Sequence, residues 1–298
     1  MSSKIRKASH AGSWYSDSPK ELNNQLTRWL SAAELNHGPA RAIIVPHAGY
    51  SYCGECAGWA YRQVSPNVVS RVFILGPSHH VRLSGCAISS ATKYSSPLYD
   101  LHVDTAVYDQ LEADHPNTFE RMSISVDEDE HSLEMTIPYV AKVMEERKNH
   151  FGIVPVMVGS LTPEKEAVYG AIFAPYLADP TNLFVISSDF CHWGSRFRYT
   201  YYDQSKGAIH QSISHLDKQG MDIIETLNPT AFTDYLRKFQ NTICGRHPIG
   251  VLLNAVKHLP EKEKSNFQLR FLKYAQSNQC FNHSDSSVSY ASASLISK

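Results

Sequence analysis

Short, continuous apolar runs are the clearest feature of the hydrophobic pattern along this chain. Four of them, at residues 41–45, 71–76, 153–158 and 183–187, are rich in β-branched side chains and are bounded by turn residues. Runs of this kind are typical of strands that are covered on both faces, as in a parallel sheet. The pattern therefore predicts a sheet whose centre is largely parallel.

Helical patterns occupy the segments between these runs. Residues 54–63, 131–147 and 163–178 carry apolar positions at helical spacing. A capping box that begins at Ser18, with proline at the first helical position, starts another helix before the first run. Alternating strands and helices predict βαβ units with right-handed crossovers.

The second half of the chain is more helical and ends in an alternating pattern. It predicts helices at 204–217, 219–227, 229–239 and 248–258, and closing strands, antiparallel at an edge of the sheet, at 266–275 and 286–296. No stretch rich in proline, glycine or serine separates two halves. The sequence thus predicts a single α/β domain over residues 1–298, with a largely parallel central sheet and helices on both faces.

Charge and composition narrow the classes of function. The chain has 28 Lys and Arg against 29 Asp and Glu, a net charge of -1, and no dense basic stripe, so nucleic acid is not an expected partner. No segment approaches the roughly 18 uncharged residues of a spanning helix, and the first residues lack the apolar stretch expected of a secretory leader. We expect a protein of the cytoplasm or nucleus whose six scattered cysteines remain thiols.

Histidine and cysteine residues follow several of the predicted elements. His47, His79 and His192 come after apolar runs, and Cys244 lies at the entrance of the helix that Pro248 opens. A single histidine after a strand more often caps a loop, but the carboxyl ends of strands share one rim, where such residues can meet. Imidazole and thiolate together suit zinc, copper or iron, so the pattern predicts one shared metal site. His80 is the residue most easily confused with His79.

Residues flanking these positions have two interpretations each. Asp189 lies three residues before His192 and either holds its imidazole in one tautomer or caps the turn. His131 and Glu134 share a helix face and could bind metal or support the ligands, and His247 lies at the same helix entrance as Cys244. The acidic run at 127–130 is more simply a favourable charge cluster at a helix start.

Two further motifs carry weaker signals. Cys53 and Cys56 form a CxxC at a predicted helix entrance, where the helix dipole lowers a thiol pKa, but they are also small residues in a first helical turn. Residues 196–202 alternate arginines and aromatic residues, which suits phosphate or peptide binding as well as a loop that covers the sheet. No phosphate-cradling glycine loop, G-x-S-x-G elbow or H-E-x-x-H motif occurs.

Several motifs in order resemble the Memo family, named for a mediator of ErbB-driven cell motility. They are PHAGY at 46–50, GPSHH at 76–80, EHSLEM at 130–135 and SDFCHWG at 188–194. The likeness covers nearly the whole chain, and NTICGRHPIG at 241–250 resembles the animal proteins in particular. The resemblance identifies the chain as a eukaryotic member.

The resemblance implies a fold similar to class III extradiol dioxygenases, which hold Fe(II) with two histidines and one glutamate and use a further histidine as acid or base. His47 and His79 match the imidazole ligands and His192 the acid/base position, while Cys244 falls where the carboxylate would be. A thiolate is softer than a carboxylate and can itself be oxidised, so copper or iron redox chemistry replaces ring cleavage as the expectation.

Three functional hypotheses follow from the residues and the resemblance. The first is a redox protein with one copper or iron ion per chain, bound by His47, His79 and Cys244, with His192 moving protons and Asp189 orienting it. Memo proteins are associated with copper-dependent redox activity, iron binding, phosphotyrosine peptides and signals from receptor tyrosine kinases to Rho-pathway proteins. The second hypothesis is a noncatalytic phosphotyrosine-peptide adaptor, and the third is a ring-cleaving dioxygenase.

Overall fold

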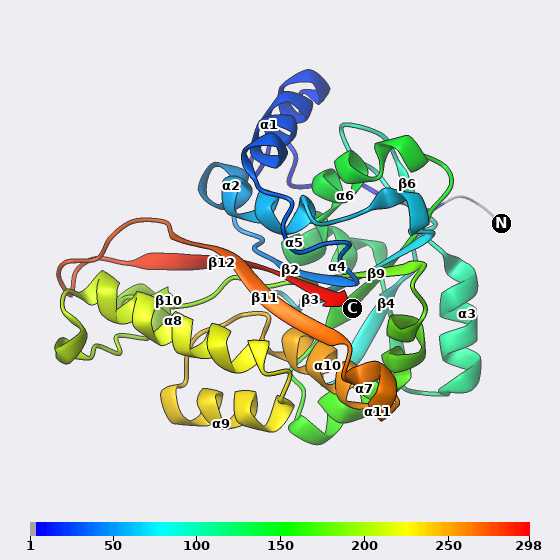
Figure 1. Ribbon diagram of the computed structural model, residues 1–298. Coiled ribbons are helices and arrows are strands. Elements are labelled where there is room, and N and C mark those ends of the chain that lie inside the picture. The colour runs from blue at the N-terminus through cyan, green and yellow to red at the C-terminus, as the bar shows by residue number, and fades with distance from the viewer. Residues whose placement is uncertain (1–3) are drawn as a thin grey trace.

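A long mixed sheet crosses the middle of the molecule in the structure, a computed structural model that describes residues 4–298 (Figure 1). Four parallel strands form its centre in the order β2-β9-β3-β8. They are β2 (Ala42–Val45), β9 (Asn182–Ser187), β3 (Arg71–Pro77) and β8 (Gly152–Val158). These are the four predicted apolar runs, and their buried side chains confirm that both faces are covered.

Other strands extend the sheet on both sides. Beyond β8 lie β4 (Cys86–Ser89), antiparallel to β8, and β7 (Phe119–Met122), parallel to β4. Beyond β2 lies β12 (Ser287–Ser297), which is antiparallel to β2, to β10 (His192–Trp193) and to β11 (Phe267–Gln276). The predicted antiparallel closing strands are therefore confirmed, and β11 is the outer member of the pair.

Helices cover both faces of the sheet, as predicted. On one face lie α1 (Pro19–Ala32), α2 (Tyr50–Tyr61) and α6 (Ile137–Val143). On the other lie α7 (Pro163–Ala178) and α10 (Arg246–Lys257), which pack against each other and against β9, with α8 (Ile209–Glu225) and α9 (Pro229–Phe239) further out (Figure 1). The α1 N-terminus is capped by Ser18, as the capping box indicates.

Two helical predictions differ from the structure. The segment 131–147 is broken into α5 (His131–Glu134), α6 and the 3-10 turn η2 (Glu145–Arg147), because Pro138 has no N–H to continue the α5 hydrogen bonds. The predicted helices 204–217 and 219–227 form the single helix α8. Gly220 lies in its interior, where a Cβ would approach the Tyr235 ring at 3.0 Å, so the glycine allows the α8–α9 packing.

Several short elements have no counterpart in the apolar pattern. A second sheet contains β1 (Ile5–Arg6), β5 (Lys93–Tyr94) and β6 (Leu101–His102). The short helices are α3 (Thr105–Asp114), α4 (Ile124–Asp129) and α11 (Glu261–Lys264), and the 3-10 turns are η1 (Pro66–Val68), η3 (Ser195–Phe197) and η4 (Gln204–Lys206). Strands of two residues are too short to leave a periodic signal.

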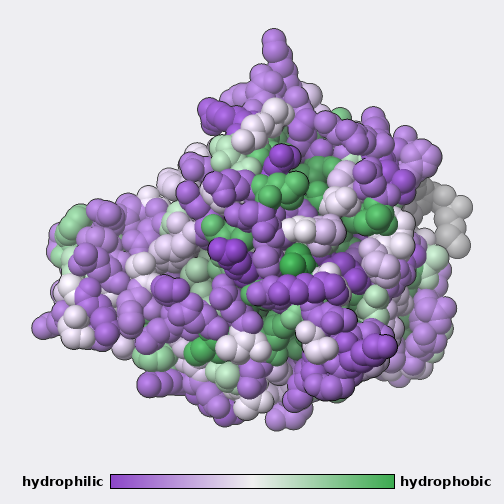
Figure 2. Space-filling view, in the orientation of Figure 1, coloured by the Kyte–Doolittle hydropathy of each residue, from purple (hydrophilic) through white to green (hydrophobic). Residues whose placement is uncertain are grey.

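The surface in the view of Figure 2 is mostly hydrophilic, and apolar residues appear in small separate groups. Within residues 4–298, no helix has the length and apolarity needed to cross a bilayer. The same residues contain a single large apolar core that joins the sheet to the helices on both faces.

Candidate metal centre

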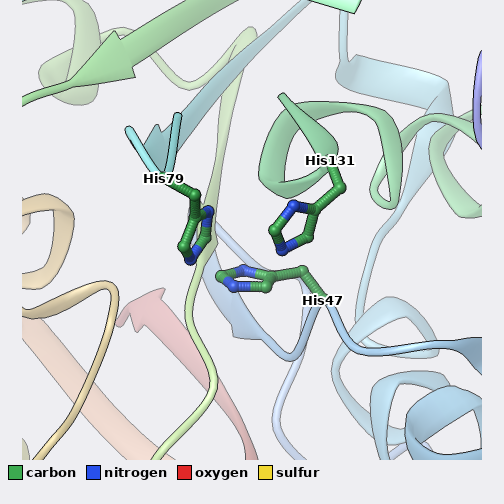
Figure 3. Close-up of side chains that lie close together, drawn as sticks. All are labelled: His47, His79 and His131. Atoms are coloured by element: carbon green, nitrogen blue, oxygen red, sulfur yellow. The ribbon is translucent and has the colours of Figure 1, made fainter. Parts of the chain in front are cut away.

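Three histidines converge where the parallel strands end (Figure 3). His47 lies two residues after β2, His79 two residues after β3, and His131 begins α5, which packs against β3. One ligand nitrogen of each lies within 4.8 Å of the others. The rim of the sheet therefore brings together His47 and His79, which were predicted to be ligands, and His131, which the sequence allowed either to bind metal or to support the ligands.

His47 is held in one orientation by buried partners. Its main-chain N–H donates to Asp189 Oδ1 at 2.8 Å, and its Nδ1 lies 2.8 Å from Ser187 Oγ. The Ser187 hydroxyl donates its own hydrogen to the Ser132 carbonyl at 2.7 Å, so the Ser187 oxygen must accept from Nδ1–H. The Nε2 lone pair of His47 is consequently free. Burial, with His79 nearby, also holds the His47 pKa well below its ordinary value.

Glu130 orients His79 from the residue before α5. The carboxylate accepts the main-chain N–H of His79 at 2.6 Å and its Nδ1–H at 2.8 Å, so the neutral form of the ring carries its lone pair at Nε2. Burial alone would raise the pKa of Glu130, but its hydrogen bonds with His79 and Ser132 lower that pKa to about 2. Glu130 is fully buried and caps the N-terminus of α5, where its side chain accepts the main-chain N–H of Ser132 at 2.8 Å, so its charge does lie at a helix start as the sequence indicated.

His131 is a member of the cluster and not only a neighbour of it. Its ring stacks on His79 with centroids 4.3 Å apart and lies 5.4 Å from the His47 ring. Burial, together with His47 and His79, lowers the pKa of His131 to about 3, so the ring is neutral at pH 7. Trp14 covers it from the other side, with ring centroids 4.5 Å apart.

Cys244 contacts the cluster through His47. Its Sγ lies 3.2 Å from His47 Nε2 and accepts the main-chain N–H of Asp189 at 3.2 Å. Because His47 Nε2 carries the lone pair, the thiol donates to it. Burial, followed by the charge of Asp189, raises the pKa of the Cys244 thiol well above its usual range. Gly245 permits the close approach, since a Cβ there would lie 2.3 Å from Ser188 Cβ.

His192 lies on β10, beside the segment that carries Cys244. Its Nδ1–H is within hydrogen-bonding distance of the Phe190 carbonyl at 2.9 Å and the Thr242 carbonyl at 3.0 Å. Carbonyls only accept, so Nδ1 carries a proton and the neutral form of the ring has its lone pair at Nε2. The ring is thus oriented by main-chain carbonyls, whereas the carboxylate of Asp189 accepts from His47. Burial raises the pKa of Asp189 above its ordinary value.

Three other residues singled out in the sequence have partners of their own. Glu134 accepts hydrogen bonds from Arg6, from His10 Nδ1 at 2.7 Å and from the Tyr15 hydroxyl at 2.8 Å. Its carboxylate therefore holds residues 6–15 against α5. The Nδ1 of His247 donates to Glu166 of α7 at 2.7 Å. The ring of His80 lies 6.0 Å from that of His131.

The two weaker motifs form no part of the cluster. Cys53 and Cys56 are buried free thiols within α2, and burial raises the pKa of Cys56 to about 12, the opposite of the effect expected at a helix entrance. Their environment does not favour redox activity. In the 196–202 segment, Phe197 contacts the His192 ring at 5.3 Å and Tyr199 donates to the Phe239 carbonyl, so this loop borders the site and covers the sheet.

Glu130 and Trp14 are the site residues that sequence reasoning missed. The only signal for Glu130 was its position directly before His131, inside an acidic run that any helix start can carry. Trp14 is separated from His131 by more than a hundred residues, so no local pattern links them. The three imidazoles, two of them oriented by hydrogen bonds at Nδ1, form a site that could hold a metal ion.

Comparisons with known proteins give relatives that are similar over nearly the whole chain. Protein MEMO1 of Homo sapiens is 59% identical over 297 residues, covering 99% of both chains. Protein MEMO1 of Danio rerio is 62% identical, covering 98% of this chain and 97% of its own. Protein memo-1 homolog of Caenorhabditis elegans is 53% identical, covering 98% of this chain and 82% of its own.

An uncharacterised protein of Escherichia coli K12 is a more distant structural neighbour. It aligns with a TM-score of 0.49 at 12% identity, covering 84% of this chain and 98% of its own. The family described as Memo-like protein matches residues 6–294, the range that contains every residue of the histidine cluster. Together with relatives that are more than half identical over nearly full length, this match shows that the chain belongs to the Memo-like family.

Proposed function

We propose that this protein binds one copper or iron ion through His47, His79 and Cys244 and uses it in redox chemistry. The observation that carries the proposal is the convergence of the histidine cluster, with the Cys244 sulfur 3.2 Å from His47 Nε2. Both imidazoles already present an Nε2 lone pair, because Ser187 and Glu130 engage the opposite nitrogens. No rearrangement of these two rings is needed before they can act as ligands.

The donor chemistry fits a soft or borderline metal. The separation of 3.2 Å between His47 Nε2 and Cys244 Sγ means that one ion could be held by both donors. Two imidazoles and a sulfur favour copper or iron over hard cations, and His131 supplies a further imidazole where more ligands are required.

The surrounding residues suit proton handling next to such a centre. Bound copper or iron would supply one-electron transfer. His192 holds its Nδ1 proton on main-chain carbonyls and can take a proton at Nε2, and the Cys244 thiol keeps its proton and donates it as a hydrogen bond to His47 Nε2 when no ion is bound. A copper-dependent oxidoreductase that produces reactive oxygen species is the enzyme class that this arrangement supports.

The proposed cellular role follows the family. We place the protein in signalling from receptor tyrosine kinases to Rho-pathway proteins and the cytoskeleton, in cell motility, and in the cytoplasm or nucleus.

One observation favours the phosphotyrosine-peptide adaptor as a second candidate function. Arg196 packs over Phe197, whose ring contacts His192, so a guanidinium that could bind a phosphotyrosine lies near the His192 ring. The dioxygenase has less support, because the nearest carboxylates, Glu130 and Asp189, already accept hydrogen bonds from the ligands.

Anaerobic metal titration tests the proposal. Chelated and then desalted protein is titrated with Cu(I), against a chromophoric competitor, and with Fe(II). We expect close to one ion per chain and at least a tenfold weaker affinity for His47→Asn and Cys244→Ser. His247→Asn is the matched control, because His247 bonds Glu166, and it should bind like the wild type.

Two outcomes would contradict parts of the proposal. Wild-type affinity in Cys244→Ser together with a large loss in His131→Asn would mean a three-histidine site without the sulfur. Binding of a phosphotyrosine peptide to metal-free protein, abolished by His47→Ala and accompanied by no measurable metal affinity, would favour the adaptor.

A further inference from the structure

A groove next to the histidine cluster has properties that neither metal binding nor the proton chemistry uses. It has a volume of about 720 Å³ and runs between residues 12–17, the first turns of α1 and the start of α2. Trp14 forms part of its wall and contacts His131 on its other side. We propose that this groove binds an arginine side chain presented by a partner protein.

The charges that line the groove favour a cation. Asp17, Glu21 and Glu55 line it with a single basic residue, Arg28, so carboxylates exceed cations by two. Among residues 4–298, no ion pair joins Asp17 or Glu21 to a base, and Glu55 reaches only Lys273 at 4.0 Å, the outer limit for such a pair. These carboxylates repel a phosphate, so the groove differs in ligand class from the loop that carries Arg196.

The aromatic rings that line the groove also favour binding of a guanidinium. Tyr52 is 64% exposed and Trp14 is 37% exposed, although large aromatic side chains of this kind are usually buried. Trp29 completes the wall, and Gly54 makes room for it, since a Cβ at Gly54 would lie 2.5 Å from the indole. A guanidinium stacks on such rings and can bond a nearby carboxylate at the same time.

Packing already holds these rings in place, so binding costs little side-chain conformational entropy. Trp14 packs against His131 with ring centroids 4.5 Å apart, and Trp29 stacks on Tyr139 with ring centroids 6.3 Å apart. Arg28 already lies 5.8 Å from the Trp29 ring, so the exposed rings of Trp14 and Tyr52 are the ones open to a partner's guanidinium. The groove is open and also lined by serine and glutamine side chains that can bond a peptide main chain, which favours a peptide over a small free cation.

Titration with defined peptides tests this inference without reference to the metal. The probe is an acetylated and amidated five-residue peptide of three glycines and two arginines, followed by tryptophan fluorescence and calorimetry on the full-length protein. The comparison peptide replaces both arginines by citrulline, which has nearly the same shape and no charge. We expect the citrulline peptide to bind at least tenfold more weakly, and the arginine peptide to weaken as salt is raised.

Matched variants locate the binding. Tyr52→Ala and Glu21→Gln should each weaken the arginine peptide at least fivefold, whereas Glu146→Gln, an exposed carboxylate outside the groove, should not change it. Both groove residues are exposed, so their variants are expected to fold. His47→Asn should bind the peptide like the wild type, which separates this inference from the metal proposal. Equal affinity for the two peptides, no binding at about 1 mM, or wild-type affinity in both groove variants would overturn it.

Discussion

Replacing Arg6 by methionine should be among the most destabilising single changes in this protein. The Arg6 side chain is 1% exposed, and its Nε lies 3.3 Å from Asp127 Oδ1. Nη1 pairs with Glu134, and Nη2 donates to the main-chain carbonyls of Asp127 at 2.8 Å and Glu130 at 3.0 Å. One guanidinium therefore joins β1 to α4 and to the start of α5.

The magnitude follows from the burial of the partners. Methionine keeps the apolar stem but removes the positive charge that pairs with the buried carboxylates of Glu134 and Asp127, and breaking a buried pair in this way costs about 3–5 kcal/mol. The neutral donors that remain, Ser89 and Tyr94 on Asp127 and Tyr15 on Glu134, do not replace that charge. The matched control is Arg121→Met. The Arg121–Glu112 pair is 35% and 38% exposed, so its loss should cost at most about 1 kcal/mol.

The pH dependence provides an independent check of the cause. Burial tends to raise the pKa of Glu134, but the hydrogen bond from His10 and the charge of Arg6 lower it below its ordinary 4.5. Stability from a carboxyl with a lowered pKa is present above its unfolded pKa and is lost as pH falls through the folded pKa. The deficit of Arg6→Met should therefore be largest near pH 7 and shrink below about pH 4.5.

Urea unfolding followed by circular dichroism measures this deficit. The wild type and both arginine variants are compared at pH 7 and at two values below 4.5. A deficit below about 1 kcal/mol for Arg6→Met at pH 7, or one that grows as pH falls, would refute the reasoning. An equal loss in Arg121→Met would show that burial is not what makes the Arg6 pairs important.

Three further predictions concern the site and the core. Glu130→Gln should weaken Cu(I) or Fe(II) binding about 10–100-fold in competition titrations, because His79 loses the carboxylate that orients it. Cys56 should resist iodoacetamide at pH 8 in the native protein, as mass spectrometry can show, because its pKa is about 12; alkylation as fast as in unfolded protein would contradict this. Phe73→Ala should lower the free energy of unfolding by about 3–5 kcal/mol in urea, because its ring is fully buried between Phe184 and Tyr176; a loss below 1 kcal/mol would contradict the packing argument.

The central sheet was predictable because burial on both faces leaves a direct mark on the sequence. The four parallel strands coincide with the four apolar runs, and α1 begins at the predicted cap. The short strands β4 and β7 were not predicted, because strands of four residues are too short to show a distinct period. The segment 131–147 shows the opposite error, since its apolar spacing suits one long helix that Pro138 interrupts.

The site was predictable only in part, and the division has a physical cause. His47 and His79 follow strands of one parallel sheet, so topology alone brings them to a common rim. His131 reaches that rim from a short helix, and its position depends on how α5 packs on β3, which no local pattern encodes. Cys244 contacts His47 because Gly245 lets the chain approach Ser188, a contact between segments more than fifty residues apart.

The direction of the imidazole protons is the property that most distinguishes this cluster from a chance meeting of histidines. His47, His79 and His192 all use Nδ1 as donor, to a hydroxyl, a carboxylate and two main-chain carbonyls respectively. These acceptors come from different elements, yet each binds the proton at Nδ1, so the neutral form of each ring has its lone pair at Nε2. The tautomer of a core histidine is set by its own partners and has no reason to agree with that of its neighbours. Three rings that share one tautomer near one rim are what a ligand and proton-transfer site requires, and this agreement depends on tertiary contacts that the sequence pattern cannot display.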